Sequence, residues 1–207
     1  MRKIVSQYKK DKKRKTNQFI VGGVLIFIML FSTLGYSFMG KEDGNEKLKK
    51  INYNGFEFVE QNDFWFTSKE NSNFVFKYNP EQIETIESEL KSIDNYYGKP
   101  LYILSESLEA ESEIYKNIYN LVQRMQYACL AQEENILYNN KTLKWLNNDE
   151  CEEDFPIKTC EDNFIIIKEH NDTGVIQEEN CIFIYGPQEN LTKLTDGFLF
   201  KILGIEQ

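Results

Sequence analysis

The spacing of apolar residues divides the chain into segments of different character. Residues 19–38 (FIVGGVLIFIMLFSTLGYSF) form a run of twenty residues without a charged side chain. A helix rises about 1.5 Å per residue, so this run matches the roughly 30 Å thickness of a bilayer's hydrocarbon core. It predicts one membrane-spanning helix. A cleaved signal peptide is the alternative, and Gly35-Tyr36-Ser37 offers a weak cleavage site for it.

After residue 50 the apolar and polar positions alternate, which is typical of strands. The segments 51–60, 64–67 and 73–78 are rich in aromatic residues and are separated by Asn, Gly and Ser. This pattern predicts an antiparallel meander. Most of the aromatic side chains should form its core. Alternation also turns some of them outward, and a surface aromatic such as Trp65 is expected to contact a partner or the membrane surface.

From Asn79 onward the apolar spacing lengthens to that of a helix. Asn79-Pro80-Glu81-Gln82 has the capping pattern of a helix start, and apolar residues follow it at helical spacing. This predicts a helix over residues 79–97. A second helix is predicted over 108–130, and a third begins at Gly186-Pro187.

Short, wholly apolar runs lie between these helices and predict strands buried on both faces. They occupy residues 101–104, 164–167 and 181–185. We expect the first two to be parallel, since a right-handed crossover joins them. The predicted fold class is a single N-terminal transmembrane helix plus one α+β (mixed-sheet α/β) extracytoplasmic domain, in which an N-terminal antiparallel meander is followed by α-β-α-β-β-α.

Charge divides the chain at the same places. Residues 1–15 hold eight basic side chains and one acidic one, whereas residues 41–207 hold 16 basic and 32 acidic ones, a net charge of −16. The positive-inside rule places the basic end in the cytoplasm and the acidic part outside the cell membrane. The expected organisation is a basic cytoplasmic tail (1–18), a transmembrane signal anchor (19–38), a polar tether (39–50) and an acidic extracytoplasmic domain (51–207).

All four cysteines lie in the acidic part, at Cys129, Cys151, Cys160 and Cys181. An even number of cysteines in a domain outside the cell predicts two disulfides. Three pairings are open, and in one of them a local bridge joins Cys151 and Cys160 across an eight-residue segment. The spacing contains no Cys-x-x-Cys, which argues against a zinc site and against thiol redox chemistry.

Three Asn-x-Ser/Thr sequences, beginning at Asn140, Asn171 and Asn190, are candidate glycosylation sites. The first two lie in predicted loops and are the better candidates.

A search for catalytic motifs gives one constellation. The ends of the predicted parallel strands bring Ser105, Ser107 and His170 to one edge of the sheet, and these residue types suit acyl transfer. The structural alternative is that a serine caps the following helix and that the histidine lies in an exposed loop. The acidic run 149–154 lacks the glycine of a calcium-binding loop. We therefore expect no metal and no cofactor.

The leading functional hypothesis is a membrane-anchored extracytoplasmic binding or scaffolding module of the cell envelope, as a subunit of a larger membrane complex. Its expected partners are the lipid bilayer, through residues 19–38, and a protein in the membrane or envelope. Nucleic acid is not expected, because the acidic domain repels phosphate backbones. The alternative is a membrane-tethered serine hydrolase-like enzyme that uses Ser105 or Ser107 with His170.

Overall fold

The computed structural model describes residues 48–131, 136–138, 141–143, 151 and 154–206. The predicted tail, the predicted transmembrane segment, tether residues 39–47 and Asn140 lie outside the described residues. Within the described residues, every helix is too short or too polar to cross a bilayer.

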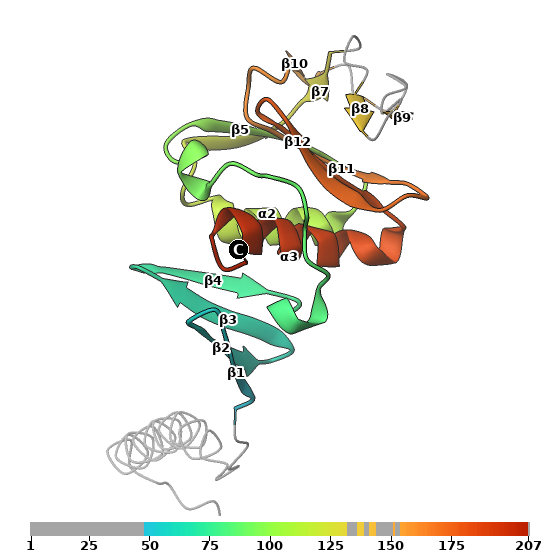
Figure 1. Cartoon of the computed structure of the whole chain (residues 1–207). Coiled ribbons are helices and arrows are strands. Elements are labelled where there is room, and N and C mark those ends of the chain that lie inside the picture. The colour runs from blue at the N-terminus through green and yellow to red at the C-terminus, as the bar shows by residue number, and fades with distance from the viewer. Residues whose placement is uncertain (1–47, 132–135, 139–140, 144–150, 152–153, 207) are drawn as a thin grey trace, which may run out of the picture. The chain divides into compact units, whose positions relative to one another are not determined.

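The predicted antiparallel meander is confirmed, except that residues 51–60, predicted as one strand, form two strands joined by a turn. Strands β1 (Lys50–Tyr53), β2 (Phe56–Gln61), β3 (Phe64–Lys69) and β4 (Ser72–Phe76) pair antiparallel in chain order (Figure 1). Two-residue turns join the first three strands, at Asn54-Gly55 and at Asn62-Asp63, and all four turn residues have positive φ angles. Positive φ at both positions is the backbone geometry of the tightest hairpins, which Asn, Asp and Gly adopt readily.

A second, five-stranded sheet has the order β12-β13-β11-β5-β6. The strands are β5 (Pro100–Ser105), β6 (Arg124–Tyr127), β11 (Phe164–Glu169), β12 (Gly174–Glu178) and β13 (Cys181–Gly186). The predicted parallel pairing of β5 and β11 is confirmed, with Ile103 opposite Ile165. The edge strands β6 and β12 are additions to the prediction, and only β12 is antiparallel to its neighbour.

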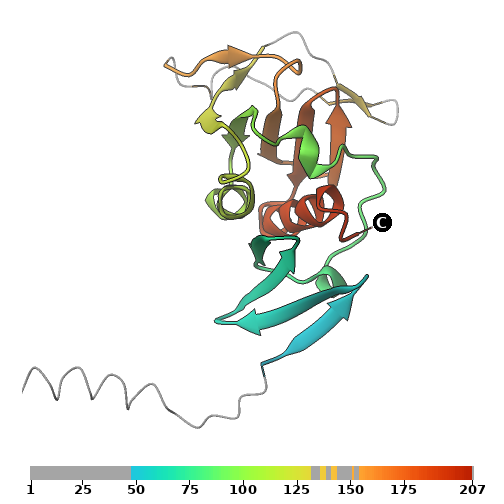
Figure 2. The ribbon, with the colours of Figure 1, turned by 90° about the vertical axis from the view of Figure 1, so that its left-hand side faces the viewer.

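Helices α2 (Leu108–Ile118) and α3 (Leu191–Ile202) lie side by side between the two sheets. The layers are therefore four-stranded sheet, two helices, five-stranded sheet, as Figures 1 and 2 show. One core joins the three layers, because each helix is apolar toward both sheets. Its most completely buried side chains include Phe58, Phe76, Leu101, Ile103, Ile114, Ile118, Ile165, Ile167, Ile182, Ile184, Phe198 and Phe200.

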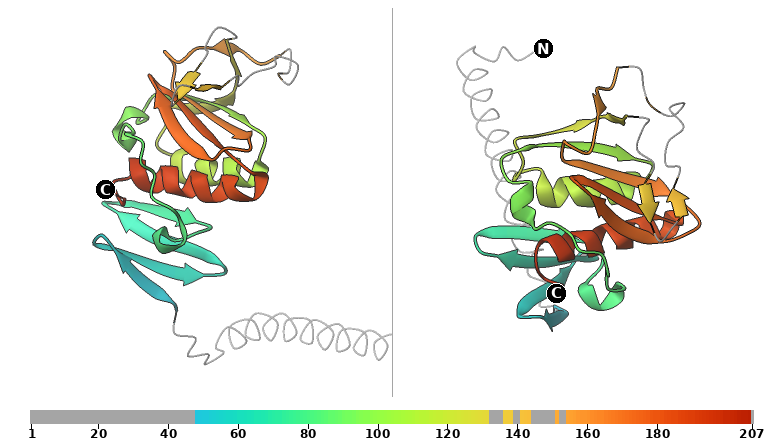
Figure 3. Two further views of the ribbon diagram at one scale, coloured as in Figure 1. Left: turned by 45° about the vertical axis from the view of Figure 1, so that its right-hand side comes forward. Right: turned by 45° about the horizontal axis from the view of Figure 1, so that its top comes forward.

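The other face of the five-stranded sheet carries a second core, which includes Tyr102, Phe164, Ile166 and Phe183. Above it lie two short strand pairs, β7 (Cys129–Leu130) with β10 (Ile157–Lys158) and β8 (Ile136–Tyr138) with β9 (Lys141–Leu143), visible in Figure 3.

Two disulfides join the cysteines, as predicted. Cys129 pairs with Cys151 and Cys160 pairs with Cys181, with Cα atoms 5.9 and 4.9 Å apart. The local Cys151–Cys160 bridge is therefore wrong. Cys160 instead lies beside the start of β13, where the Asn180 N–H donates to the Cys160 carbonyl oxygen at 3.1 Å. The Cys160–Cys181 bond fastens the segment between β6 and β11 to the five-stranded sheet, whereas the Cys129–Cys151 bond lies within that segment.

The helix predicted over residues 79–97 is wrong. The capping box forms at Asn79 and Gln82, but only the 3-10 turns η1 (Pro80–Gln82) and η2 (Ile93–Asn95) follow, and most of the segment between them is irregular. This segment crosses α3 and is held by β12: the Ser88 hydroxyl donates to the Val175 carbonyl oxygen at 2.5 Å. Its isoleucines still face the core, so tertiary contacts override the local preference for a helix.

The helix predicted over residues 108–130 is too long. Helix α2 ends at Ile118, and residues 124–127 form β6, which pairs with β5. Pairing with the edge of the sheet satisfies backbone groups of residues 124–127 that a longer helix would have bonded internally. The predicted burial of Ala128 and Cys129 is nevertheless correct.

Candidate functional site

The carboxyl ends of β5, β11 and β13 meet at one edge of the five-stranded sheet, where the sequence places its catalytic candidates. The Glu106 N–H donates to the Ile167 carbonyl oxygen at 3.0 Å, and the His170 N–H donates to the Gly186 carbonyl oxygen at 2.9 Å. The chain segments that carry the predicted serines and histidine are therefore neighbours. The side chains decide what this edge does.

Both serine hydroxyls are engaged at the start of α2. The Ser105 hydroxyl donates to the Ser107 carbonyl oxygen at 2.9 Å and accepts from the Ser107 N–H at 3.1 Å. The Ser107 hydroxyl accepts from the Ala110 N–H at 3.3 Å, as the N-cap of the helix. N-caps of this kind satisfy one of the unpaired amides of the first turn. The hydrogen bonds of both hydroxyls are thus explained by a structural role at the start of α2.

His170 is half-buried in the loop between β11 and β12. Its Nδ1 accepts from the Asp172 N–H at 2.9 Å, and its ring lies edge-on to the Tyr185 ring with centroids 5.8 Å apart. In the neutral ring the proton therefore resides on Nε2. The candidate glycosylation residue Asn171 is exposed in the same loop, whereas Asn190 is half-buried at the start of α3.

An ion pair between Lys168 and Glu106 lies at this edge, where β5 and β11 end. The Lys168 ammonium, on a side chain that is 11% exposed, lies 3.0 Å from Glu106 Oε1, and the Glu169 N–H donates to Glu106 Oε2 at 2.7 Å. Glu106 therefore ties the β5–α2 junction to the end of β11. The charges here stabilise the junction of two parallel strands.

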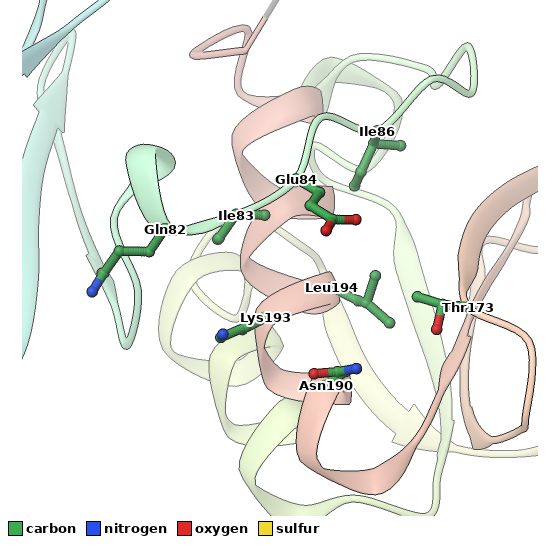
Figure 4. A pocket seen from close by; sticks show the side chains of 8 residues that line it. All are labelled: Gln82, Ile83, Glu84, Ile86, Thr173, Asn190, Lys193 and Leu194. Carbon is green, nitrogen blue, oxygen red and sulfur yellow. The ribbon is translucent and has the colours of Figure 1, made fainter.

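A pocket of about 340 Å³ lies beside this edge, between residues 82–86 and the first half of α3. Ile83, Ile86 and Leu194 form its apolar wall, and Glu84 and Thr173 lie on either side of Leu194 (Figure 4). The remaining lining residues are Gln82, Asn190 and Lys193.

The sequence analysis missed this pocket because a helix was expected at residues 79–97. The pocket exists because that segment is irregular and lies across α3. One signal was Gly197: a Cβ there would lie 3.0 Å from Ile83 and 3.1 Å from Ile86. A glycine within a helix marks a place where another segment approaches the helix backbone closely.

Two buried carboxyl groups meet between α2 and α3, away from the pocket. Asp196 Oδ2 accepts from the Tyr78 N–H at 2.9 Å, and Glu113 Oε1 lies 2.6 Å from the Lys116 ammonium. Their other oxygens, Asp196 Oδ1 and Glu113 Oε2, are buried and have no hydrogen-bond partner among the described residues. Burial, followed by repulsion from Glu113, raises the pKa of Asp196 well above its ordinary value. The raised pKa favours the protonated form of the Asp196 carboxyl.

A third charged cluster surrounds Tyr102 on the opposite face of the sheet. The Arg124 guanidinium donates to the Tyr102 hydroxyl at 2.9 Å, and the Lys158 ammonium lies 4.4 Å from the centre of its ring and 3.3 Å from Asp162. A hydrogen bond from Lys158, with help from Arg124, lowers the pKa of Tyr102. Within the described residues, no three His, Cys, Asp or Glu side chains gather as metal ligands do.

Comparisons of the chain with models of protein families, with curated proteins and with solved structures gave no match. The function is therefore argued from the geometry of these sites.

Proposed function

We propose that this protein is a membrane-anchored binding module, displayed outside the cell membrane, that holds a protein partner in the envelope. Residues 1–18 are its cytoplasmic tail and residues 19–38 its anchor. The charge pattern of the N-terminus supports this orientation. The two disulfides support it as well, since disulfides persist in oxidising compartments.

The pocket beside α3 is the observation that carries the proposal. Its volume of about 340 Å³ lies within the usual range for binding pockets. Ile83, Ile86 and Leu194 suit an apolar side chain, while the oxygens of Glu84 and Thr173 accept hydrogen bonds beside it. The net charge of −16 over residues 41–207 favours a basic partner through electrostatic complementarity. The pocket thus suits an apolar side chain flanked by donors.

Two charge reversals test this proposal. Glu84 lines the pocket, whereas Glu87, three residues later, is exposed and lies outside its lining. The full chain is purified from gently solubilised membranes as wild type, Glu84→Lys and Glu87→Lys. We expect a stoichiometric partner with the wild type and Glu87→Lys, and loss of that partner with Glu84→Lys. Recovery of the wild-type chain alone would count against the proposal.

The enzyme hypothesis makes a different prediction. A serine hydrolase that uses Ser105 or Ser107 would lose its turnover when His170 is replaced by alanine. A binding module should keep its fold and its partner, because His170 lies in a loop and the loss of its hydrogen bond with the Asp172 N–H costs about 1 kcal/mol. Partner recovery and an esterase assay on the same His170→Ala preparation separate the two functions.

A further inference from the structure

The four-stranded sheet has one face turned away from the helices (Figure 1). Strand alternation buries Trp65 and Thr67 against the helices and turns Phe64 and Phe66 to this outer face. The expectation that Trp65 is a surface aromatic is therefore wrong, since it is 2% exposed, and Phe66, at 39%, takes that place. We define the outer face by Leu48, Lys50, Val59, Phe64, Phe66, Val75 and Lys77.

Apolar side chains run across three strands of this face. Val59 is paired with Phe66, and Phe66 with Val75, so the three lie in one row across β2, β3 and β4. Phe64 lies two residues before Phe66 on β3. Leu48, just before β1, is 53% exposed. A row of this kind on an otherwise polar surface marks an interaction site.

Lysines lie on this face and around its Phe64 ring, in a domain that is acidic overall; of these, Lys116 belongs to α2 and is also paired with Glu113. The ammonium groups of Lys77 and Lys116 lie 5.2 and 4.9 Å from the centre of the Phe64 ring. Lys50, in the row of Val59, is exposed and lies 3.0 Å from Glu57. Aromatic rings with lysines around them are the composition that settles at the headgroup level of an anionic bilayer.

The length of the preceding chain brings this face to the bilayer. Nine residues, 39–47, separate the apolar run from Leu48, which belongs to the outer face. Fully extended, they span at most about 30 Å, at 3.3–3.6 Å per residue. We propose that the outer face rests on the anionic lipid surface into which residues 19–38 insert. This inference rests on the anchor in the proposed function.

A second copy of the chain is a poorer occupant. Two outer faces packed together would bring the Lys77 ammonium groups of both copies into one apolar interface. Burying unpaired charges of one sign in an apolar interface is strongly unfavourable, because they lose their hydration without gaining a counter-ion. Anionic headgroups pair with the same lysines.

Tryptophan fluorescence of the full chain in vesicles tests the inference. The vesicles contain phosphatidylglycerol and phosphatidylcholine with brominated acyl chains, which quench nearby tryptophans. The probe variant is Phe66→Trp, and the matched control is Ile157→Trp. Ile157 is 72% exposed on β10, at the opposite end of the domain from β1 (Figure 1). The wild type supplies the background of its two native tryptophans.

We expect the bromine to quench the emission added by Phe66→Trp and to leave that added by Ile157→Trp unchanged. Adding Lys77→Glu to the probe variant should reduce the quenching, because it removes one attraction to the anionic lipid. Flotation of each variant with the vesicles and a circular dichroism spectrum like that of the wild type establish insertion and folding.

The remaining outcomes separate this inference from the proposed function. A chain that does not float with the vesicles overturns the anchor and the inference together. If the chain floats while bromine leaves the emission added by Phe66→Trp unchanged, the inference alone is overturned. The emission of Phe66→Trp could instead shift to the blue as the protein-to-lipid ratio rises, without quenching by bromine. That result identifies a second copy as the occupant of the outer face and also overturns the inference.

Discussion

The four-stranded and five-stranded sheets of this protein bury their faces differently. The four-stranded sheet packs one face on α2 and α3 and leaves Phe66 exposed on the other. The five-stranded sheet packs the helices on one face and a second core, with the Cys160–Cys181 disulfide, on the other. Accordingly, β3 alternates buried and exposed residues, whereas β13 is buried throughout. Within the described residues, the outer face is the sheet surface that no other helix or strand covers.

The largest expected difference is between two phenylalanines of the four-stranded sheet. Phe76 is fully buried, with its ring 4.5 Å from the centre of the Phe200 ring, whereas Phe66 is 39% exposed. Phe76→Ala should cost about 3–5 kcal/mol of unfolding free energy, because it leaves a cavity in the shared core. Phe66→Ala should cost about 1 kcal/mol or less. Chemical denaturation of both variants measures the difference, and equal costs would contradict the one-sided burial.

The two disulfides allow a test of how much the second core of the five-stranded sheet contributes to stability. Cys160 and Cys181 are 2% and 0% exposed, whereas Cys151 is half-buried. Replacing the Cys160–Cys181 pair by alanines should cost about 2–4 kcal/mol. The Cys129–Cys151 pair is a matched control, because the separations are 21 and 22 residues and the loop entropies are therefore nearly equal. We expect the larger loss of unfolding free energy on removal of Cys160–Cys181, because this bond is the more buried one. A larger loss on removal of Cys129–Cys151 would show that the second core depends little on the Cys160–Cys181 bond.

The edge of the four-stranded sheet offers the next test. The Asn117 side chain, on α2, accepts from the Val75 N–H at 2.8 Å and donates to the Val75 carbonyl oxygen at 2.7 Å. It acts as a neighbouring strand would and closes the edge of β4. Asn117→Ala should cost about 1–3 kcal/mol, because both groups lose their partner. Asn52→Ala, at an exposed position of β1, is the control, and its stability should match that of the wild type in the same denaturation series.

The smallest effect concerns the buried carboxyl pair, and it depends on pH. Because the pKa of Asp196 is raised in the folded protein, its contribution to stability is fully present below its ordinary pKa of 3.8 and is lost as the pH rises through the raised value. Asp196→Asn should therefore be more stable than the wild type at pH 8. Denaturation midpoints measured from pH 4 to pH 8 check this, and a constant difference between the two proteins would show that Asp196 does not hold the proton.

Much of the fold was predictable where a residue's pattern and its neighbours favour the same structure. The antiparallel meander, the strands β5, β11 and β13, and helix α3 follow from local spacing. The capping residues Asn79 and Ser107 were also recognisable, and both cap as their residue types favour. The irregular conformation of the residues after Asn79 could not be predicted, because their apolar spacing fits a helix equally well.

The sequence by itself determined the buried strands 101–104, 164–167 and 181–185, how the charge is divided and that the cysteines form two disulfides, since these follow from side-chain chemistry. Only the tertiary structure decided which cysteines pair, where α2 ends and that residues 83–92 cross α3 to form the pocket. It also decided that Phe66 faces outward while Trp65 is buried. These choices depend on contacts between segments far apart in the chain, and a one-residue change of register exchanges the two faces of a strand.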